Sequence, residues 1–116
     1  MSTFFQSQEH EWEDLGSGIK RKIVGHTDNL MAVHLCFDKN AVGHPHAHDI
    51  HDQIGYVVEG SFEAEVNGVK QILKKGDAYI AQKHFVHGAV ALENNSILLD
   101  MFSPAREDFL NKTLTP

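Results

Sequence analysis

The chain has 116 residues, of which 41% are hydrophobic, and it carries a formal net charge of -6 at pH 7. This length suits one folded domain with a single core, and the hydrophobic fraction argues against a disordered chain. The negative charge argues against nucleic acid as a partner, and no apolar run reaches the roughly 20 residues that span a bilayer. A lone Cys36, without a recognisable signal peptide, excludes an internal disulfide and predicts a cytoplasmic location.

The order of apolar and turn residues predicts a series of short strands. Residues 1–16 mix aromatic and acidic side chains, and we expect a loose arm with one short strand. In LMAVHLCF, residues 30–37, apolar side chains alternate, which is typical of a strand with one buried face. Asn67-Gly68 indicates a two-residue hairpin turn, since both central residues of a type I′ turn need positive φ. Strands are predicted over residues 19–24, 30–37, 54–59, 62–66, 69–73, 78–81, 84–91 and 96–102.

A helix is expected only near the end of the chain. Ser103 before Pro104 has the pattern of a helix cap followed by a first-turn proline, so residues 104–110 are predicted to form one or two helical turns. Many short strands with a single terminal helix indicate an all-β sandwich or barrel. An immunoglobulin-like sandwich also fits the strand count, but it gives no reason for the histidines.

Residues 43–60, GHPHAHDIHDQIGYVVEG, contain four of the nine histidines. On a strand, His46 and His48 would share one face at a separation of about 6.6 Å. Two such imidazoles can converge on one ion, at metal–nitrogen distances of about 2.0–2.1 Å. Gln53 and His87 offer further ligand atoms from other segments. The alternative interpretation is a polar loop with scattered surface histidines.

The spacing of these residues resembles the two-part motif of the cupin family. The first part is His46-x-His48-x4-Gln53-x6-Gly60, within residues 43–60, and the second is Gly76-x10-His87, within residues 76–91. The resemblance implies that residues 1–116 form a single cupin domain, a jelly-roll barrel also called a double-stranded β-helix, with a short C-terminal helix. It also implies that the two histidines of the first part bind one metal ion together with Gln53 and His87.

Two departures from the usual cupin pattern stand out. Glutamate is usual at the position of Gln53, and the second motif has Gln82 and His84 where proline and glycine are expected. Three neutral imidazoles and a neutral amide would leave the double positive charge of a divalent ion uncompensated. Such a centre is a stronger Lewis acid and attracts an anionic substrate, which the acidic chain otherwise repels. Imidazole nitrogen suits several metals, so nickel, zinc, manganese and iron all remain open.

A narrower resemblance is to the KdgF family of small single-domain cupins. It is carried by HDIHDQIGYVVEGSFEAEVNG, GDAYIAQKHFVHGAV and LLDMFSPAREDFL, and it extends to WEDLGSGIKRKI near the N-terminus. The resemblance implies an isomerase-like, non-redox reaction in pectin and alginate breakdown. In that reaction cyclic 4,5-unsaturated uronates become linear 4-deoxy-5-keto uronates, by ring opening and tautomerisation. The family's catalytic aspartate and arginine fall on Asp100 and Arg106.

Asp100 is unusual without any family knowledge. It interrupts the apolar strand ILLDMF, and a buried carboxylate is costly unless it is paired or functional. If Leu99 and Met101 face outward, Asp100 faces the interior, although a salt bridge at the strand end is the structural alternative. Arg106 has no such signal and otherwise resembles an exposed helix residue.

Several further assignments stay open at this stage. His44, His51 and His84 are expected at the rim of the site, and Asp49 and Asp52 are either solvated or partners of a ligand imidazole. A metal-dependent dioxygenase, a ligand-sensing cupin and a metal-free barrel are the alternatives to the uronate reaction. Small cupins commonly form homodimers, and the N-terminal aromatic residues are candidates for that contact. These residues are Phe4, Phe5 and Trp12.

Overall fold

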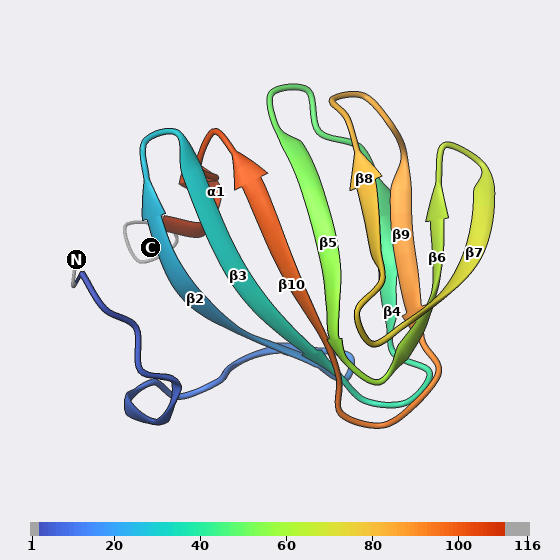
Figure 1. Cartoon of the computed structure of the whole chain (residues 1–116), viewed down its shortest axis with the longest axis horizontal. Coiled ribbons are helices and arrows are strands. Elements are labelled where there is room, and N and C mark those ends of the chain that lie inside the picture. The colour runs from blue at the N-terminus through green and yellow to red at the C-terminus, as the bar shows by residue number, and fades with distance from the viewer. Residues whose placement is uncertain (1–2, 111–116) are drawn as a thin grey trace.

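Two antiparallel sheets face each other in the structure, a computed structural model that describes residues 3–110 (Figure 1). The first sheet has the order β1 (Glu13–Gly16), β2 (Ile19–Thr27), β3 (Leu30–Phe37), β10 (Ser96–Ser103), β5 (Asp52–Glu59) and β8 (Ala78–Ala81). The second has the order β4 (Val42–His46), β9 (His87–Ala91), β6 (Ser61–Val66) and β7 (Val69–Lys74). Helical structure within residues 3–110 is limited to a 3-10 turn, η1 (Ser7–Glu9), and to α1 (Glu107–Leu110). The predicted all-β class with a short C-terminal helix is therefore confirmed.

Alternation along the two central strands decides which side chains reach the interior. On β10, every second residue from Ser96 to Phe102 is buried, while the residues between are partly exposed. On β5, Gln53, Gly55 and Val57 are buried, and Ile54 and Tyr56 between them are exposed. Successive side chains of a strand point to opposite faces. The buried residues of these two strands therefore face the interior, and the residues between them lie on the outer face of the sheet.

One apolar cluster fills the space between the sheets, a second packs the C-terminal segment against the first sheet, and a polar section lies between the two. Phe37 and Phe62 pack edge to face with ring centroids 5.1 Å apart in the larger cluster. The smaller cluster contains Met31 and Phe102. Inward-facing Asp100 lies between the two clusters along β10, since Leu98 belongs to the larger and Phe102 to the smaller. The fold thus provides a polar section with apolar packing on both sides.

The strand predictions hold with adjusted ends. The predicted hairpin turn is confirmed, because Asn67 and Gly68 have φ of 52° and 86° between β6 and β7. The strand predicted over 84–91 begins only at His87, since His84 has a left-handed φ of 72° and lies in the preceding turn. The first two residues of the predicted arm lie outside the described residues. Within residues 3–110, no helix has the length and apolar character needed to cross a membrane.

The predicted start of the C-terminal helix is wrong. Ser103 is the last residue of β10 and still pairs with Asp52 of β5, so it does not cap a helix. The Ser103–Pro104 peptide bond is cis, and the helix begins only at Glu107. Residues 104–106 instead form the connection between β10 and α1 (Figure 1).

Gly60 is needed where the chain passes from the first sheet to the second. Its φ is 74°, and a Cβ at this position would lie 2.2 Å from Oγ and 2.8 Å from Cα of Ser96. Ser96 cannot move freely, because its hydroxyl accepts a hydrogen bond from the Ser61 amide and donates to the Glu93 carbonyl. Glycine is therefore required here for both backbone conformation and space.

Gly60→Ala is expected to lower the free energy of unfolding by about 3 kcal/mol, because it combines left-handed strain with a backbone collision. Gly68→Ala is the matched control, since Gly68 has φ of 86° with no atom within 4 Å of an added Cβ. The control should lose only the conformational share, about 1 kcal/mol. Urea denaturation measures both values, and equal losses in the two variants would contradict the steric argument.

Candidate metal centre

Three histidines converge at one end of the polar section. His46, the last residue of β4, pairs with His87, the first residue of β9, so the two imidazoles start from neighbouring positions. The ring centroids are 4.5 Å apart for His46 and His87, and 5.1 Å apart for His48 and His87. One potential ligand atom from each of the three lies within 4.8 Å of the others. Such a group can hold a metal ion.

His48 reaches the group by a different route from the one predicted. Strand β4 ends at His46, so His48 lies in the following loop rather than two residues along the same strand. The register explains this, because His46 is the last β4 residue with a partner on β9. The ring of His48 is nevertheless 4.8 Å from that of His46. The loop, and not alternation along one strand, brings the imidazoles of His46 and His48 together.

Backbone carbonyls orient two of the imidazoles. Nδ1 of His46 lies 2.8 Å from the His44 oxygen, and Nδ1 of His87 lies 3.0 Å from the Phe85 oxygen. A carbonyl oxygen only accepts hydrogen bonds, so a proton on Nδ1 satisfies it and leaves the lone pair of Nε2 for a metal. Burial lowers the pKa of His87, and burial together with the charge of Arg106 lowers the pKa of His48 to about 4. Neutral imidazoles, the form that binds metals, therefore prevail near neutral pH.

Gln53 adds an oxygen that points at the same place. Its Oε1 lies 2.9 Å from Nε2 of His87 and 3.1 Å from Nε2 of His48, while its Nε2 donates to the Tyr79 hydroxyl at 3.0 Å. A neutral His87 has one ring proton and cannot donate to both the Phe85 and the Gln53 oxygens; with the proton on Nδ1, its Nε2 and the Gln53 oxygen are two acceptors facing each other. A cation between them removes this repulsion. The arrangement therefore fits a divalent transition metal ion, with nitrogen and oxygen ligands of the kind such ions accept.

A cavity of about 220 Å³ extends from this group into the space between the sheets. Its polar wall contains His46, Gln53, His87, Asp100 and Arg106. Asp100 is 5% exposed. Burial raises the pKa of Asp100 to about 7, against the opposing effect of hydrogen bonds from Gln53 and Tyr79 and of the charge of Arg106. The interior orientation expected for this carboxyl is what the structure shows.

Arg106 lies at the end of the cavity, between β10 and α1. Its guanidinium lies over the Phe109 ring, 4.0 Å from the centroid, and 5.2 Å from the Phe102 centroid. Nε and Nη2 both donate to the carboxylate of Asp108. The aromatic rings and this ion pair fix the plane of the guanidinium. Arg106 is therefore a half-buried cation on the cavity wall and not a freely exposed helix residue.

Two cavity residues were missed from the sequence. Arg21 is 8% exposed, donates from Nε to Glu13 at 2.8 Å and lies 4.3 Å from the Phe109 centroid. Its alternation with Ile19 and Ile23 along β2 was a signal that could have placed it inside. Tyr79 carried no such signal, because its position depends on the register between two strands far apart in the chain.

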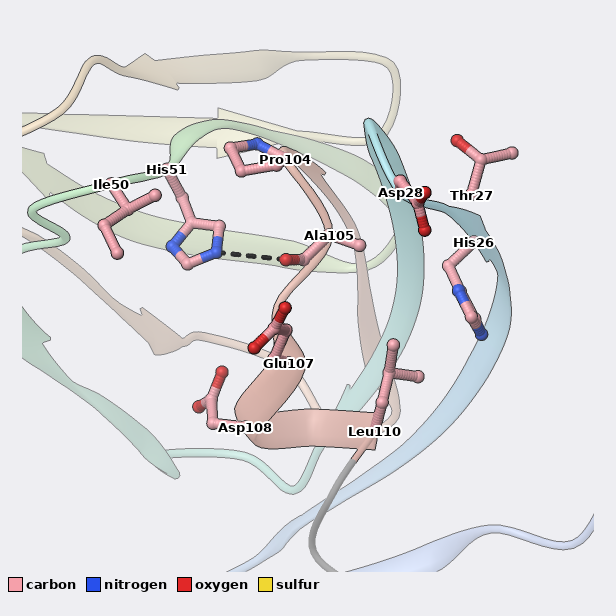
Figure 2. Close-up of a pocket in the computed structure, with 10 residues that line it drawn as sticks. All are labelled: His26, Thr27, Asp28, Ile50, His51, Pro104, Ala105, Glu107, Asp108 and Leu110. Carbon is pink, nitrogen blue, oxygen red and sulfur yellow. Dashed lines mark hydrogen bonds between the residues drawn. The ribbon is translucent and has the colours of Figure 1, made fainter.

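A second, larger cleft lies outside this cavity, next to α1 (Figure 2). Its volume is about 680 Å³, and Asp28, Glu107 and Asp108 give its wall acidic character. Figure 2 shows His51 turned toward the Ala105 carbonyl, 3.3 Å from Nε2. The His51 ring is also 5.7 Å from that of His48, so His51 lies between the outer cleft and the histidine group.

The other histidines and aspartates near the site stay on the surface. His44 and His84 are exposed, and Nδ1 of His84 lies 3.5 Å from Oδ1 of Asp49. Asp52 accepts a hydrogen bond from the Lys83 amide. The Nδ1 atoms of His46 and His87 are thus held by backbone carbonyls rather than by these aspartates.

Comparison with known proteins connects this geometry to one family. The family described as Cupin domain matches residues 33–100. The chain is 56% identical over 110 residues to the pectin degradation protein KdgF of Dickeya dadantii, which covers 95% of this chain and 100% of that protein. The structure of KdgF from Halomonas sp. superimposes with a TM-score of 0.92 at 55% identity, covering 94% of this chain and 99% of that one. An RmlC-like cupin from Shewanella frigidimarina gives a TM-score of 0.89 at 47% identity, covering 94% and 96%.

His46→Ala is expected to weaken binding of a divalent metal at least about tenfold, because it removes one imidazole from the group. His44→Ala is the matched control. It also changes an exposed histidine of the same segment, but only the backbone carbonyl of His44 contacts the group. Calorimetric titration with Zn²⁺ or Ni²⁺ measures both affinities. Equal affinity in His46→Ala and His44→Ala would show that the histidine group is not the metal site.

Proposed function

This chain belongs to the cupin domain family, and within it to the KdgF pectin degradation proteins; on that premise we propose that it converts unsaturated uronate monosaccharides. In this proposal the substrate is a cyclic 4,5-unsaturated uronate released from pectin or alginate by lyases. The product is the linear 4-deoxy-5-keto uronate. The observation that carries the proposal is the buried carboxyl of Asp100 in the same cavity as the histidine group, connected to Gln53 through the Tyr79 hydroxyl.

The proposed metal ligands are His46, His48, Gln53 and His87, holding one divalent ion of nickel, zinc, manganese or iron. When bound, the ion supplies a Lewis acid that polarises substrate oxygens. Because all four ligands are neutral, they add no negative charge to a chain whose formal net charge is already -6. The site then stays attractive to an anionic sugar.

The proposed reaction moves one proton and changes no oxidation state. The anomeric hydroxyl gives up its proton, the bond between C1 and the ring oxygen breaks, and C1 becomes an aldehyde carbonyl. The electron pair left on the former ring oxygen forms the C5 ketone, and the electrons of the C4–C5 double bond take up a proton at C4. Asp100 is the group that accepts the first proton and returns one to C4. A carboxyl whose pKa is close to neutrality suits both directions of transfer.

Arg106 is proposed to hold the carboxylate of the substrate. A guanidinium offers two parallel donors to a carboxylate, and its plane is already fixed here by Phe109 and Asp108. The cavity of about 220 Å³ is small for a ligand site, where about 300–1,000 Å³ is common. Such a space suits a monosaccharide better than an oligosaccharide.

Asp100→Asn is expected to lower kcat by about 10²–10⁴-fold, because the amide cannot carry the proton. Metal content and folding should stay close to those of the wild type, since the amide fills the same space. Loss of the ultraviolet absorbance of the conjugated enol follows the reaction. Near-full activity of Asp100→Asn would contradict the assigned role.

Arg106→Ala provides the contrast to that variant. It should mainly raise KM for the uronate, while metal content stays unchanged, because it removes a contact to the substrate carboxylate and not a proton carrier. A kcat loss like that of Asp100→Asn with no change in KM would show that the two roles are wrongly divided.

We also propose that the protein is located in the cytoplasm, where its buried free thiol stays reduced. Cell fractionation tests this location. We further propose that the protein acts as a homodimer. The outer face of the six-stranded sheet supports the dimer. Ile54 on β5 pairs with Ile80 on β8 on this outer face. These two side chains are 41% and 65% exposed. Two of the N-terminal aromatic residues that were expected at a dimer contact have contacts within the same chain. Phe5 stacks on His10, and Trp12 contacts Lys20 and Lys22.

Ile80→Lys is expected to raise the dissociation constant of this dimer at least about tenfold, because a two-fold interface places the new charge twice in an apolar contact. Ile72→Lys is the matched control, since Ile72 is 54% exposed on β7 of the other sheet. Light scattering over a dilution series measures the mass. Dimers of equal strength in the two variants, or a monomeric wild type, would contradict the proposed interface.

A further inference from the structure

We propose that Tyr79 is a positioning residue that fixes the Gln53 amide and the Asp100 carboxyl relative to each other. Its hydroxyl accepts a hydrogen bond from Nε2 of Gln53 at 3.0 Å and faces Oδ1 of Asp100 at 3.5 Å, with the proton directed to the carboxylate. One hydroxyl thus joins the residue beside the histidine group to the residue assigned to proton transfer. The catalytic part of this inference rests on the function proposed above, whereas the metal-binding part does not.

The backbone register brings Tyr79 and Asp100 into one row across three strands. Gly55 of β5 pairs with Tyr79 of β8 on one side and with Asp100 of β10 on the other. Paired residues of neighbouring strands point to the same face of a sheet, so both side chains enter the cavity. Both indeed line it. Between them lies a residue with no side chain.

The glycine between them makes room for the tyrosine ring. A Cβ on Gly55 would lie 2.3 Å from Cε2, 2.4 Å from Cζ and 2.8 Å from the hydroxyl oxygen of Tyr79. Gly55 does not have the positive φ that would require glycine for conformational reasons. The ring therefore lies directly against the backbone of β5, and only glycine permits this approach. This position of the hydroxyl depends on two residues that are 24 positions apart in the sequence.

The Tyr79 hydroxyl determines which end of the Gln53 amide faces the histidines. The Gln53 amide has one end that donates and one that accepts, and the two ends face different partners. With the NH₂ group donating to the Tyr79 hydroxyl, the oxygen must face the imidazoles of His48 and His87. The reverse orientation would place the amide oxygen against the oxygen of a hydroxyl whose proton is directed to Asp100, acceptor against acceptor. Tyr79 therefore stabilises the orientation in which Gln53 offers its oxygen to a metal.

Tyr79→Phe removes this hydroxyl and leaves the ring in place. We expect Co²⁺ affinity to fall about tenfold or more, as is usual when a partner behind a metal ligand is lost. The visible absorption bands of the Co²⁺-loaded protein should shift, because the Gln53 amide is no longer held. With the uronate as substrate, kcat should fall at least about tenfold while KM changes little, since no substrate contact is removed.

Tyr56→Phe is the matched control, because it removes the hydroxyl of the second of the two tyrosines of the chain, on the outward face of the neighbouring strand. A packing role alone would change the melting temperature of Tyr79→Phe without changing the Co²⁺ spectrum. If Tyr79→Phe and Tyr56→Phe agree in Co²⁺ affinity, spectrum and kcat, the inference is overturned. If the wild type does not convert the uronate at all, the proposed function fails, but the affinity and the spectrum still decide on Tyr79.

Gly55→Ala supplies a second, independent variant that keeps every polar group. Its methyl group should displace the Tyr79 ring and reproduce the Co²⁺ shift of Tyr79→Phe. In the double variant the two losses should not add, because both act through the same hydroxyl. Fully additive losses, or a Gly55→Ala spectrum identical to that of the wild type, would refute the proposed connection between Gly55, Tyr79 and Gln53.

Discussion

Gln53 and His87 face each other with two acceptor atoms at the centre of the site. With the His87 proton on Nδ1, directed to the Phe85 carbonyl, Nε2 and the amide oxygen lie 2.9 Å apart as two acceptors. Neither group can turn away, because the imidazole is buried and the amide is bound on its far side to Tyr79. A divalent cation is the simplest partner for such an arrangement. The hydrogen bonds of Tyr79 to Gln53 and Asp100 keep the amide oxygen in this orientation.

Asp100 is the second demanding group, and its position follows from the first. A carboxyl that is 5% exposed between two apolar clusters would be costly if charged and unpaired. Gln53 and Tyr79 stabilise the charged form of this carboxyl, and the charge of Arg106 acts in the same direction. The hydrogen bond between Gln53 and Tyr79 also orients the Gln53 amide toward the imidazoles. The proposed metal ligands and the proposed proton carrier therefore belong to one hydrogen-bonded set of side chains.

Local sequence patterns predicted much of this arrangement, and tertiary contacts account for what they missed. Alternation along β10 correctly predicted that Asp100 faces the interior. A shift of one residue would have moved every side chain of this strand to the other face of the sheet. The family spacing correctly gathered His46, His48 and His87, although His48 reaches the group from a loop. No local pattern indicated a role for Tyr79, because that role comes from its register opposite Gly55 and not from neighbouring residues.

The errors near the C-terminus have a similar origin. Ser103 and Pro104 form a good local helix start, but the ladder with β5 extends to Ser103 and delays the helix until Glu107. Arg106 consequently lies before the helix, where it stacks against Phe109. Its surroundings depend on where a strand ends, which pairing with a distant segment decides. Long-range pairing overrides a local cap signal here.

Proton NMR of a 4,5-unsaturated uronate incubated with the protein in D₂O separates the proposed ring opening from the alternative reactions. We expect the vinyl signal at C4 to disappear, one deuterium to enter at C4 of a linear keto acid, and a chelator to stop the conversion. No oxygen should be consumed. A persistent vinyl signal with the metal-loaded protein, or conversion that requires oxygen, would show that the protein does not carry out this reaction.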